Sequence, residues 1–223
     1  MSQIKQIEQQ FNFKYPELYE KLHDDGMLDW GEFGKNWYAT YWEKLKNNPP
    51  LLLFANYFEI LECKRIVEEI EAFKDPEDYR ATKPEFQFIP FAITGGGNLY
   101  VFPLDKQQNG NVPVTLVPHD WEEATVLAKN LQDFIFRKML ECVAAFDEYS
   151  KLKDGVLKTN LFNMLRTHKP YLSQRQVEKL EEIYNRNESE LSTTGLISRD
   201  ELKEILQQEI GFEELDKEFV YMG

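Results

Sequence analysis

Three strand-like runs lie close together in the middle of this 223-residue chain. They span residues 86–93, 98–104 and 112–117 and are rich in apolar β-branched and aromatic side chains. The glycines at 95–97 connect the first two runs, and residues 107–111 connect the second pair. Parallel strands need long crossover segments, whereas connections this short join antiparallel neighbours. The sequence therefore predicts an antiparallel meander, with a tight glycine hairpin between its first two strands.

Helical patterns precede the meander. Apolar residues recur at helical spacing over residues 4–11, which predicts a short amphipathic helix. A second short helix is expected between Pro16, which suits a first helical turn, and Gly26, which suits a helix end. A third is expected over residues 58–73, with one apolar face and an acidic polar face. Residues 51–54, which follow two prolines, predict a buried strand.

A long helix is predicted after the meander. Asp120 and Glu123 have the spacing of a capping box, and an apolar stripe follows from residue 127 to residue 143. His119 would then lie at the entrance of this helix. Up to residue 145 the pattern is helices, a central antiparallel sheet and a closing helix, which predicts an α+β fold with the sheet flanked by helices.

The remainder of the chain has a different pattern. No strand-like run occurs there, and three helical patterns cover residues 159–167, 173–185 and 198–210. The last two begin at a serine that is followed three residues later by Gln or Glu, which is the capping-box pattern. We therefore divide the chain into an α+β domain, residues 1–145, and an all-α C-terminal extension, residues 146–223.

The chain is strongly acidic. It has 39 Asp and Glu residues against 26 Lys and Arg residues, which gives a formal net charge of −13. Such a surface repels nucleic acid and anionic lipid headgroups, so neither is expected as a partner and a basic protein is favoured.

Cysteine usage and hydropathy indicate a soluble cytoplasmic protein. Cys63 and Cys142 are too few for a disulfide framework and have no metal-ligand spacing, which favours a reducing compartment. The N-terminus lacks the pattern of a signal peptide, and the longest apolar run, residues 49–55, is well short of the ~20 residues that a membrane helix needs.

The order of several short motifs resembles the SUKH superfamily of Smi/Knr-type domains over roughly residues 1–145. After a short N-terminal helix come residues 15–19 (YPELY) before 25–26 (DG), 91–92 (FA) before 95–102 (GGGNLYVF), 113–114 (PV), 119–120 (HD) and 131–134 (LQDF). The resemblance implies a bacterial immunity protein that binds a cognate toxin domain, often a nuclease, and neutralises it by occluding its active site. Because eukaryotic relatives serve as adaptors, an intracellular adaptor or scaffold is the alternative.

The extension is similar to the second halves of two EF-hand loops, at residues 154–157 (DGVL) and 195–202 (GLISRDEL). A calcium loop needs several oxygen ligands and a carboxylate at its last position. A first loop starting at Ser150 would place Leu152 at its third position and end on Leu161, which has no carboxylate. The second would use Glu190, Ser192, Thr194, Ser198 and Glu201, without the usual aspartates. We therefore expect degenerate loops and two helical hairpins that pack without metal; a calcium sensor that uses Glu190 to Glu201 is the third alternative.

No enzyme signature is found. The glycines at 95–97 lack the Lys and Ser or Thr of a phosphate loop, and a strand follows them. His23, His119 and His168 fall on three different elements, which disfavours a histidine metal site or triad. We expect a protein that is not an enzyme and has no cofactor or metal, although a hidden acid–base pair among the many carboxylates stays open.

The most promising interface lies near the N-terminus, where acidic residues adjoin aromatic ones. Aromatic anchors beside acids suit a basic partner, because the aromatics supply buried area and the acids steer the encounter. The candidate partner-binding residues are Asp24, Asp25, Asp29, Trp30, Glu32, Trp37, Tyr38 and Trp42. The alternative is that the tryptophans fill the core and the acids are merely solvated. A second acidic run, residues 59–85, is mixed with basic residues and predicts an ordinary helix face.

Overall fold

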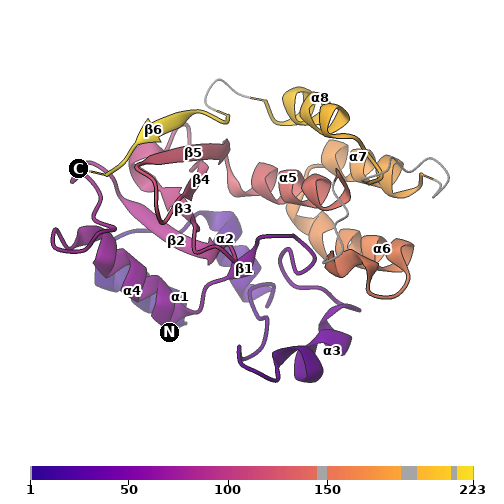
Figure 1. Ribbon diagram of the computed structural model, residues 1–223, viewed down its shortest axis with the longest axis horizontal. Helices are drawn as coiled ribbons and strands as arrows, with labels where there is room; N and C mark the ends of the chain where they lie inside the picture. The colour runs from indigo at the N-terminus through magenta and orange to yellow at the C-terminus, as the bar shows by residue number, and fades with distance from the viewer. Residues whose placement is uncertain (1, 145–149, 187–194, 212–214, 223) are drawn as a thin grey trace. The chain divides into compact units, whose positions relative to one another are not determined.

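The computed structural model describes residues 2–144, 150–186, 195–211 and 215–222 (Figure 1). The chain forms two compact units, each built from segments that are distant in the sequence. The first, called the sheet unit, comprises Met1–Lys21, Tyr57–Leu131 and Phe212–Gly223. The second, called the helical unit, comprises Leu22–Asn56 and Gln132–Gly211. The predicted domain boundary at residues 145 and 146 lies outside the described residues.

The sheet unit contains one six-stranded sheet, in which every pair of neighbouring strands is antiparallel. The strands follow each other in sequence order: β1 (Glu59–Ile60), β2 (Phe88–Ile93), β3 (Leu99–Pro103), β4 (Val114–Val117), β5 (Glu123–Ala128) and β6 (Glu218–Val220). The three strands of the predicted meander are β2, β3 and β4, so the meander is confirmed, and so is the α+β class with an antiparallel sheet.

The β2–β3 hairpin shows why the chain carries glycines at this point. Ile93 pairs with Leu99, and the Thr94 N–H donates to the Asn98 carbonyl at 2.8 Å. Only Gly97 of the three glycines has a positive φ, 92°. Since other residues rarely adopt this backbone conformation, Gly97 allows the tight turn that the sequence predicts.

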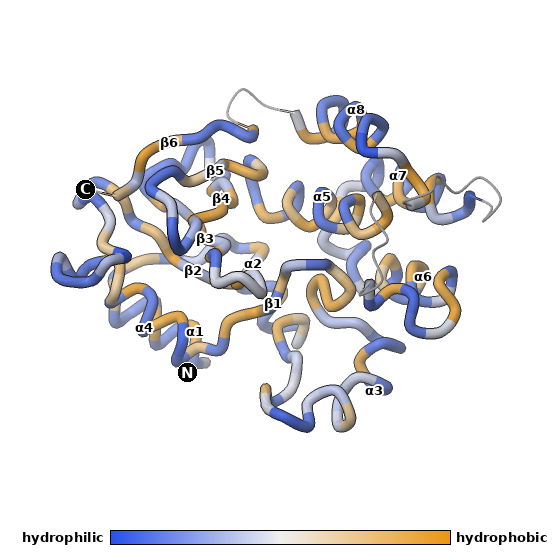
Figure 2. Tube along the Cα trace, viewed as in Figure 1, coloured by the Kyte–Doolittle hydropathy of each residue, from blue (hydrophilic) through white to orange (hydrophobic). Residues whose placement is uncertain are grey.

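Three of the predicted helices lie in the sheet unit or at its border: α1 (Gln3–Phe11), α2 (Glu17–Asp24) and α4 (Cys63–Lys74), of which α4 begins later than predicted. Phe73 of α4 packs edge-on against Phe88 of β2, with ring centroids 5.9 Å apart. On α2, Tyr19 contacts Phe102 of β3 at 5.5 Å. In Figure 2 hydrophilic and hydrophobic residues alternate along α4, as expected for a helix with one buried face.

A buried carboxylate joins α1 to the turn before α2. Glu8 is 2% exposed, its side chain accepts the Tyr15 N–H at 2.9 Å, and it pairs with Lys5 at 2.9 Å and Lys14 at 3.1 Å. Burial alone would raise the pKa of the Glu8 carboxyl, but these donors outweigh it and lower the pKa.

Three predicted elements differ in the structure. Residues 51–54 are fully buried, as predicted, but form turns and not a strand. The predicted helix at 58–73 begins with β1 and becomes helical only at Cys63. The predicted helix at 120–143 is β5 followed by α5 (Leu131–Ala144), because burial alternates residue by residue along β5, with the period of a strand. His119 and Asp120 therefore lie in the β4–β5 loop and not at a helix start.

The helical unit holds most of α5 together with α3 (Glu43–Leu45), α6 (Leu157–His168), α7 (Gln174–Tyr184) and α8 (Arg199–Glu209). The capping box of α7 is complete, with Ser173 and Gln176 exchanging both hydrogen bonds. At the start of α8 the Ser198 hydroxyl accepts the Glu201 N–H at 3.1 Å. No helix among the described residues is long and apolar enough to cross a membrane. The C-terminal part is helical as predicted except at its end, where β6 adds a strand.

Side chains from the C-terminal part hold the segment Leu22–Asn56 inside the helical unit. The Tyr171 hydroxyl donates to Asp25 at 2.8 Å, and the Leu52 N–H donates to the ring of His168 at 2.9 Å. Gly195 lies so close to α5 that a Cβ there would be 2.2 Å from the Val143 carbonyl oxygen. The helices after residue 150 and the segment 22–56 therefore fold as one body.

Candidate functional site

The structure separates the predicted partner-binding residues into buried and exposed groups. Trp30 and Trp42 are 2% and 0% exposed. The Trp30 indole N–H donates to the Leu51 carbonyl at 3.2 Å, and the Trp42 indole N–H donates to the Asp154 carboxylate. Both rings therefore belong to the core of the helical unit, and they offer a partner no surface.

Trp37 and Tyr38 are more exposed than Trp30 and Trp42. Trp37 is half-buried and donates its indole N–H to the Trp30 carbonyl at 2.7 Å. Tyr38 is 57% exposed, stacks on Trp42 with ring centroids 5.2 Å apart, and donates its hydroxyl to Asp154 at 2.8 Å. The donors on Trp42 and Tyr38 hold the pKa of the Asp154 carboxyl below its usual value.

The four acids of the predicted interface are all exposed: Asp24, Asp25, Asp29 and Glu32. Asp25 accepts the Tyr171 hydroxyl, and Asp29 accepts the Gly31 N–H at 2.9 Å, which fixes the turn before Gly31. This segment can therefore offer charge to a partner, with Tyr38 as its exposed ring.

The last ligand predicted for the second EF-hand-like loop is paired with an arginine. Glu201, the predicted last ligand of the second loop, accepts two hydrogen bonds from Arg186 at 3.0 and 2.6 Å, and this pairing lowers the pKa of its carboxyl. Glu190, Ser192 and Thr194 lie outside the described residues. Within the described residues, no group of three or more His, Cys, Asp or Glu side chains could hold a metal ion.

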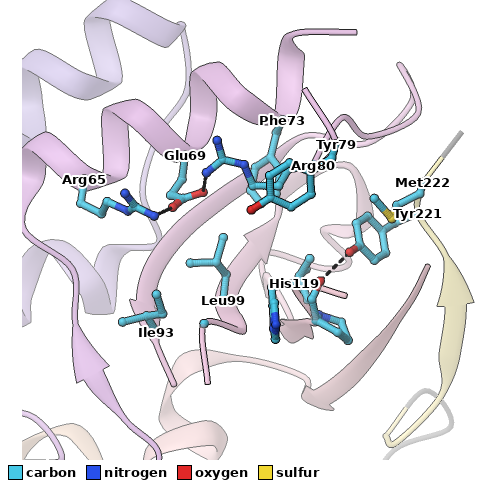
Figure 3. Close-up of a pocket in the computed structure, with 13 residues that line it drawn as sticks. Arg65, Glu69, Phe73, Tyr79, Arg80, Ile93, Leu99, His119, Tyr221 and Met222 are labelled. Atoms are coloured by element: carbon cyan, nitrogen blue, oxygen red, sulfur yellow. Dashed lines mark hydrogen bonds and ion pairs between the residues drawn. The ribbon is translucent and has the colours of Figure 1, made fainter. Parts of the chain in front are cut away.

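A pocket of about 150 Å³ lies within the sheet unit, lined by α4, the loop after it, the β4–β5 loop and the last described residues (Figure 3). Ile93, Leu99 and Val117 give it apolar walls. The Tyr221 hydroxyl holds two carbonyl oxygens of the β4–β5 loop, those of Pro118 at 2.7 Å and Trp121 at 2.9 Å. The chain end thus fixes one wall of the pocket.

A buried ion network forms the charged wall of the pocket. Glu69 is 2% exposed; its two oxygens lie 2.5 Å from Arg65 and 2.9 Å from Arg80 (Figure 3). Arg80 also binds Asp78 with two hydrogen bonds, at 2.9 and 2.7 Å, which lower the pKa of Asp78 to about 2. A charge can be buried here because it is paired on both sides.

This network was missed from the sequence, which assigns residues 59–85 to an ordinary helix face. Glu69 follows Ile66 by three residues and precedes Phe73 by four, so the helical spacing places it on the apolar face. A glutamate on that face was the available signal for a buried ion pair.

The pocket combines apolar walls with an ion network whose charges are paired. None of its described lining residues is Ser, Thr, Cys or Lys, and the charges of its ion network are already paired. His119 has its Nδ1 atom 2.8 Å from the Asn98 side-chain oxygen. What the sheet unit presents is a small apolar hollow with a rigid, charge-neutral wall.

An antiparallel sheet with helices around it defines a domain of α+β class. The family model described as SMI1 / KNR4 family (SUKH-1) matches residues 2–137, which is more than half of the chain. The chain belongs to this family, which confirms the SUKH resemblance; the EF-hand resemblance has no such support. No curated protein and no solved structure matches the chain.

Proposed function

We infer that this protein is an immunity protein that binds a cognate toxin domain and covers the active site of the toxin. It does not act on the toxin as an enzyme. The membership in the SMI1 / KNR4 (SUKH-1) family carries this proposal, because Smi/Knr-type domains of bacteria are mostly immunity proteins. The protein would act in the cytoplasm, where a toxin meets its substrate.

The charge of the chain supports a toxin that acts on nucleic acid. A nuclease domain has to be cationic around its substrate groove to hold phosphates. A chain with net charge −13 competes for those cations and associates quickly at low salt. The exposed acids Asp24, Asp25, Asp29 and Glu32 would contribute to this attraction.

An adaptor is the second candidate, and the two-unit organisation favours it. The helical unit contains residues 138–211, which lie beyond the family match. One unit could then hold one protein and the other unit a second. A pull-down that recovers many housekeeping proteins and no toxin would support the adaptor.

A growth assay tests the proposed function. The product of the gene next to this one is expressed alone and together with this chain. We expect growth arrest in the first case and rescue in the second. A neighbouring product that is harmless alone, or toxic and not rescued, would contradict the proposal.

Neutralising three of the exposed acids is expected to slow association with the toxin. The variant Asp24→Asn, Asp29→Asn and Glu32→Gln should lower the association rate at low salt by roughly tenfold, because steering depends on where the charge lies. The matched control changes three exposed acids of α7 and α8 in the same unit: Glu178→Gln, Glu181→Gln and Glu204→Gln. Stopped-flow kinetics should show a smaller effect for the control; equal rates in both variants would show that only net charge matters.

A further inference from the structure

A second hollow adjoins the pocket on the same two segments of the sheet unit. It measures about 380 Å³ and is lined by Asp120, Trp121, Glu122, Glu123 and Val220. The neighbouring residues Pro118, His119, Tyr221 and Met222 line the pocket already described. The β4–β5 loop and the end of the chain therefore shape both hollows.

Trp121 is the most prominent feature of this hollow. Its side chain is 63% exposed, and Val220 beside it is 43% exposed. An indole this exposed has most of its apolar surface still to bury, and tryptophan is among the residues that most often dominate protein interfaces.

The exposed ring stands on a fixed backbone. The Tyr221 hydroxyl donates to the carbonyl oxygens of Pro118 and Trp121, at 2.7 and 2.9 Å. The Trp121 indole N–H donates to Glu123 at 3.3 Å. A partner would therefore meet an ordered ring and would lose little conformational entropy in docking against it.

The charges around Trp121 select a basic partner. Asp120, Glu122 and Glu123 line the hollow, and the exposed Glu218 lies on β6. Three lysines lie near them. Lys217 precedes β6, the Lys83 ammonium is 3.5 Å from the Val220 carbonyl, and the Lys106 ammonium is 4.1 Å from the ring centroid of Phe219. Since the four carboxylates outnumber the lysines, an arginine or lysine of a partner can stack on the indole face and pair with an acid.

β6 is the last strand of the sheet, and no described strand pairs with its outer side. Two hydrogen bonds flank its pairing with β5: the Val126 N–H donates to the Lys217 carbonyl and the Tyr221 N–H donates to the Glu122 carbonyl, both at 3.0 Å. Backbone groups alternate in an antiparallel pair, so those of Glu218 and Val220 point away from β5.

The open stretch has defined ends. Thr82 bridges to Met222, and the Lys83 N–H donates to the Tyr221 carbonyl at 2.9 Å, so the edge is covered beyond Tyr221. What remains is the three-residue edge Glu218–Val220 beside the hollow of Trp121, with which no described strand pairs. On this edge the Val220 carbonyl accepts the Lys83 ammonium at 3.5 Å, a contact that an added strand would replace. A strand edge of this kind can accept an extended segment of another protein.

We propose that the outer edge of β6 and Trp121 dock an extended, arginine- or lysine-bearing segment of the partner protein, which adds a strand to the sheet. The identity of the partner as a toxin rests on the proposed function. Pairing of two copies of this chain is disfavoured, because each edge would bring its own carboxylates against those of the other. Nucleic acid and anionic lipid are disfavoured by the same charges.

A peptide experiment tests this surface without any toxin. The probe is an eight-residue peptide of alternating arginine and valine, and the control peptide alternates glutamine and valine. With the ¹⁵N-labelled full chain, the first peptide should shift the Trp121 indole signal and slow exchange of the Glu218 and Val220 amides by about tenfold at saturation. The Glu59 amide, on the opposite edge strand β1, should not change. No shift, equal binding of both peptides, or shifts confined to other acidic surfaces would overturn the proposal.

Variants of the full chain test it with the toxin that the growth assay identifies. Trp121→Ala combined with Glu122→Lys should weaken binding by about 30-fold or more, as expected for an interface hot spot. The matched control is Tyr57→Ala with Glu59→Lys, an exposed aromatic and an exposed acid at the β1 edge, and it should stay within threefold of the unchanged chain. Unchanged binding of the Trp121 variant would overturn the docking surface and leave the proposed function standing. A screen without any rescued toxin would instead remove the proposed function, and the peptide experiment alone would then decide the surface.

Discussion

Replacing Trp42 by alanine is expected to lower the free energy of unfolding by about 3–5 kcal/mol. The ring is fully buried, lies edge-on to Phe54 at 5.9 Å and stacks on Tyr38. The substitution leaves a large cavity and also removes a hydrogen bond to Asp154, which joins the segment 22–56 to the C-terminal part of the same unit. The midpoint of urea unfolding measures the effect, and hydrogen exchange along α6 shows whether the loss lies in the helical unit.

Trp121→Ala is the matched control, since it makes the same chemical change at a ring that is 63% exposed. It should change the free energy of unfolding by no more than about 0.5 kcal/mol. If Trp42→Ala were as mild as this control, Trp42 would not be a core residue, and the sequence-based prediction that it binds a partner would regain its support.

Acidification is expected to destabilise the helical unit through His168. The ring is fully buried; its Nε2 accepts the Leu52 N–H at 2.9 Å, and its Nδ1 lies 2.8 Å from the Met164 carbonyl, to which it donates. Burial lowers the pKa of His168 from 6.5 to about 4, although the bond to Met164 opposes this. A protonated ring would turn an N–H toward the Leu52 N–H, so the folded state binds the proton poorly.

The sign of the effect follows from proton uptake. Between about pH 6.5 and pH 4 the unfolded chain binds a proton at His168 and the folded chain does not, so the free energy of unfolding falls as the pH falls. The contribution of the neutral His168 ring to the free energy of unfolding is fully present above about pH 6.5. Roughly 3 kcal/mol of this contribution is lost by pH 4, and little more is lost below that pH. Urea unfolding from pH 7 to pH 4 measures it against His168→Gln, which should be less stable at pH 7 and lack this component. Parallel pH profiles for the two proteins would contradict the account.

The elements that were predicted correctly are those with local signals. The β2–β3 hairpin follows from the glycines beside two apolar runs, and the starts of α7 and α8 follow from Ser173 and Ser198, which cap them. Because these interactions join residues that are close together in the sequence, they can be predicted from the sequence directly.

The elements that were missed depend on distant partners. Leu52 adopts a positive φ of 54° in a buried turn, and its N–H is held by a histidine 116 residues later. β6 has three residues, and its position depends on pairing with β5, about a hundred residues earlier. β5 was absorbed into a predicted helix because its apolar residues continue into the stripe of α5. A helical period and a strand period cannot be separated over so few residues.

The candidate interface at residues 24–42 stays a prediction, and the burial of its side chains also depends on distant partners. The acids at residues 24–32 are exposed as a solvated surface requires, but the burial of Trp42 depends on Asp154, 112 residues away. The pattern of an aromatic beside acids also occurs at residues 120–123 (DWEE), where the predicted helix concealed it. There the ring is exposed, because Trp121 lies in a loop beside an open sheet edge.

We propose that this chain neutralises a toxin by binding it and not by altering it. The most direct test is a titration of the purified toxin's activity with the purified chain, using the toxin that the growth assay identifies. The account predicts that activity falls linearly and ends at one chain per toxin, with both proteins recovered chemically unchanged. Full activity at a large excess of chain would contradict the claim, and so would complete inactivation by far less than one equivalent, which would show turnover.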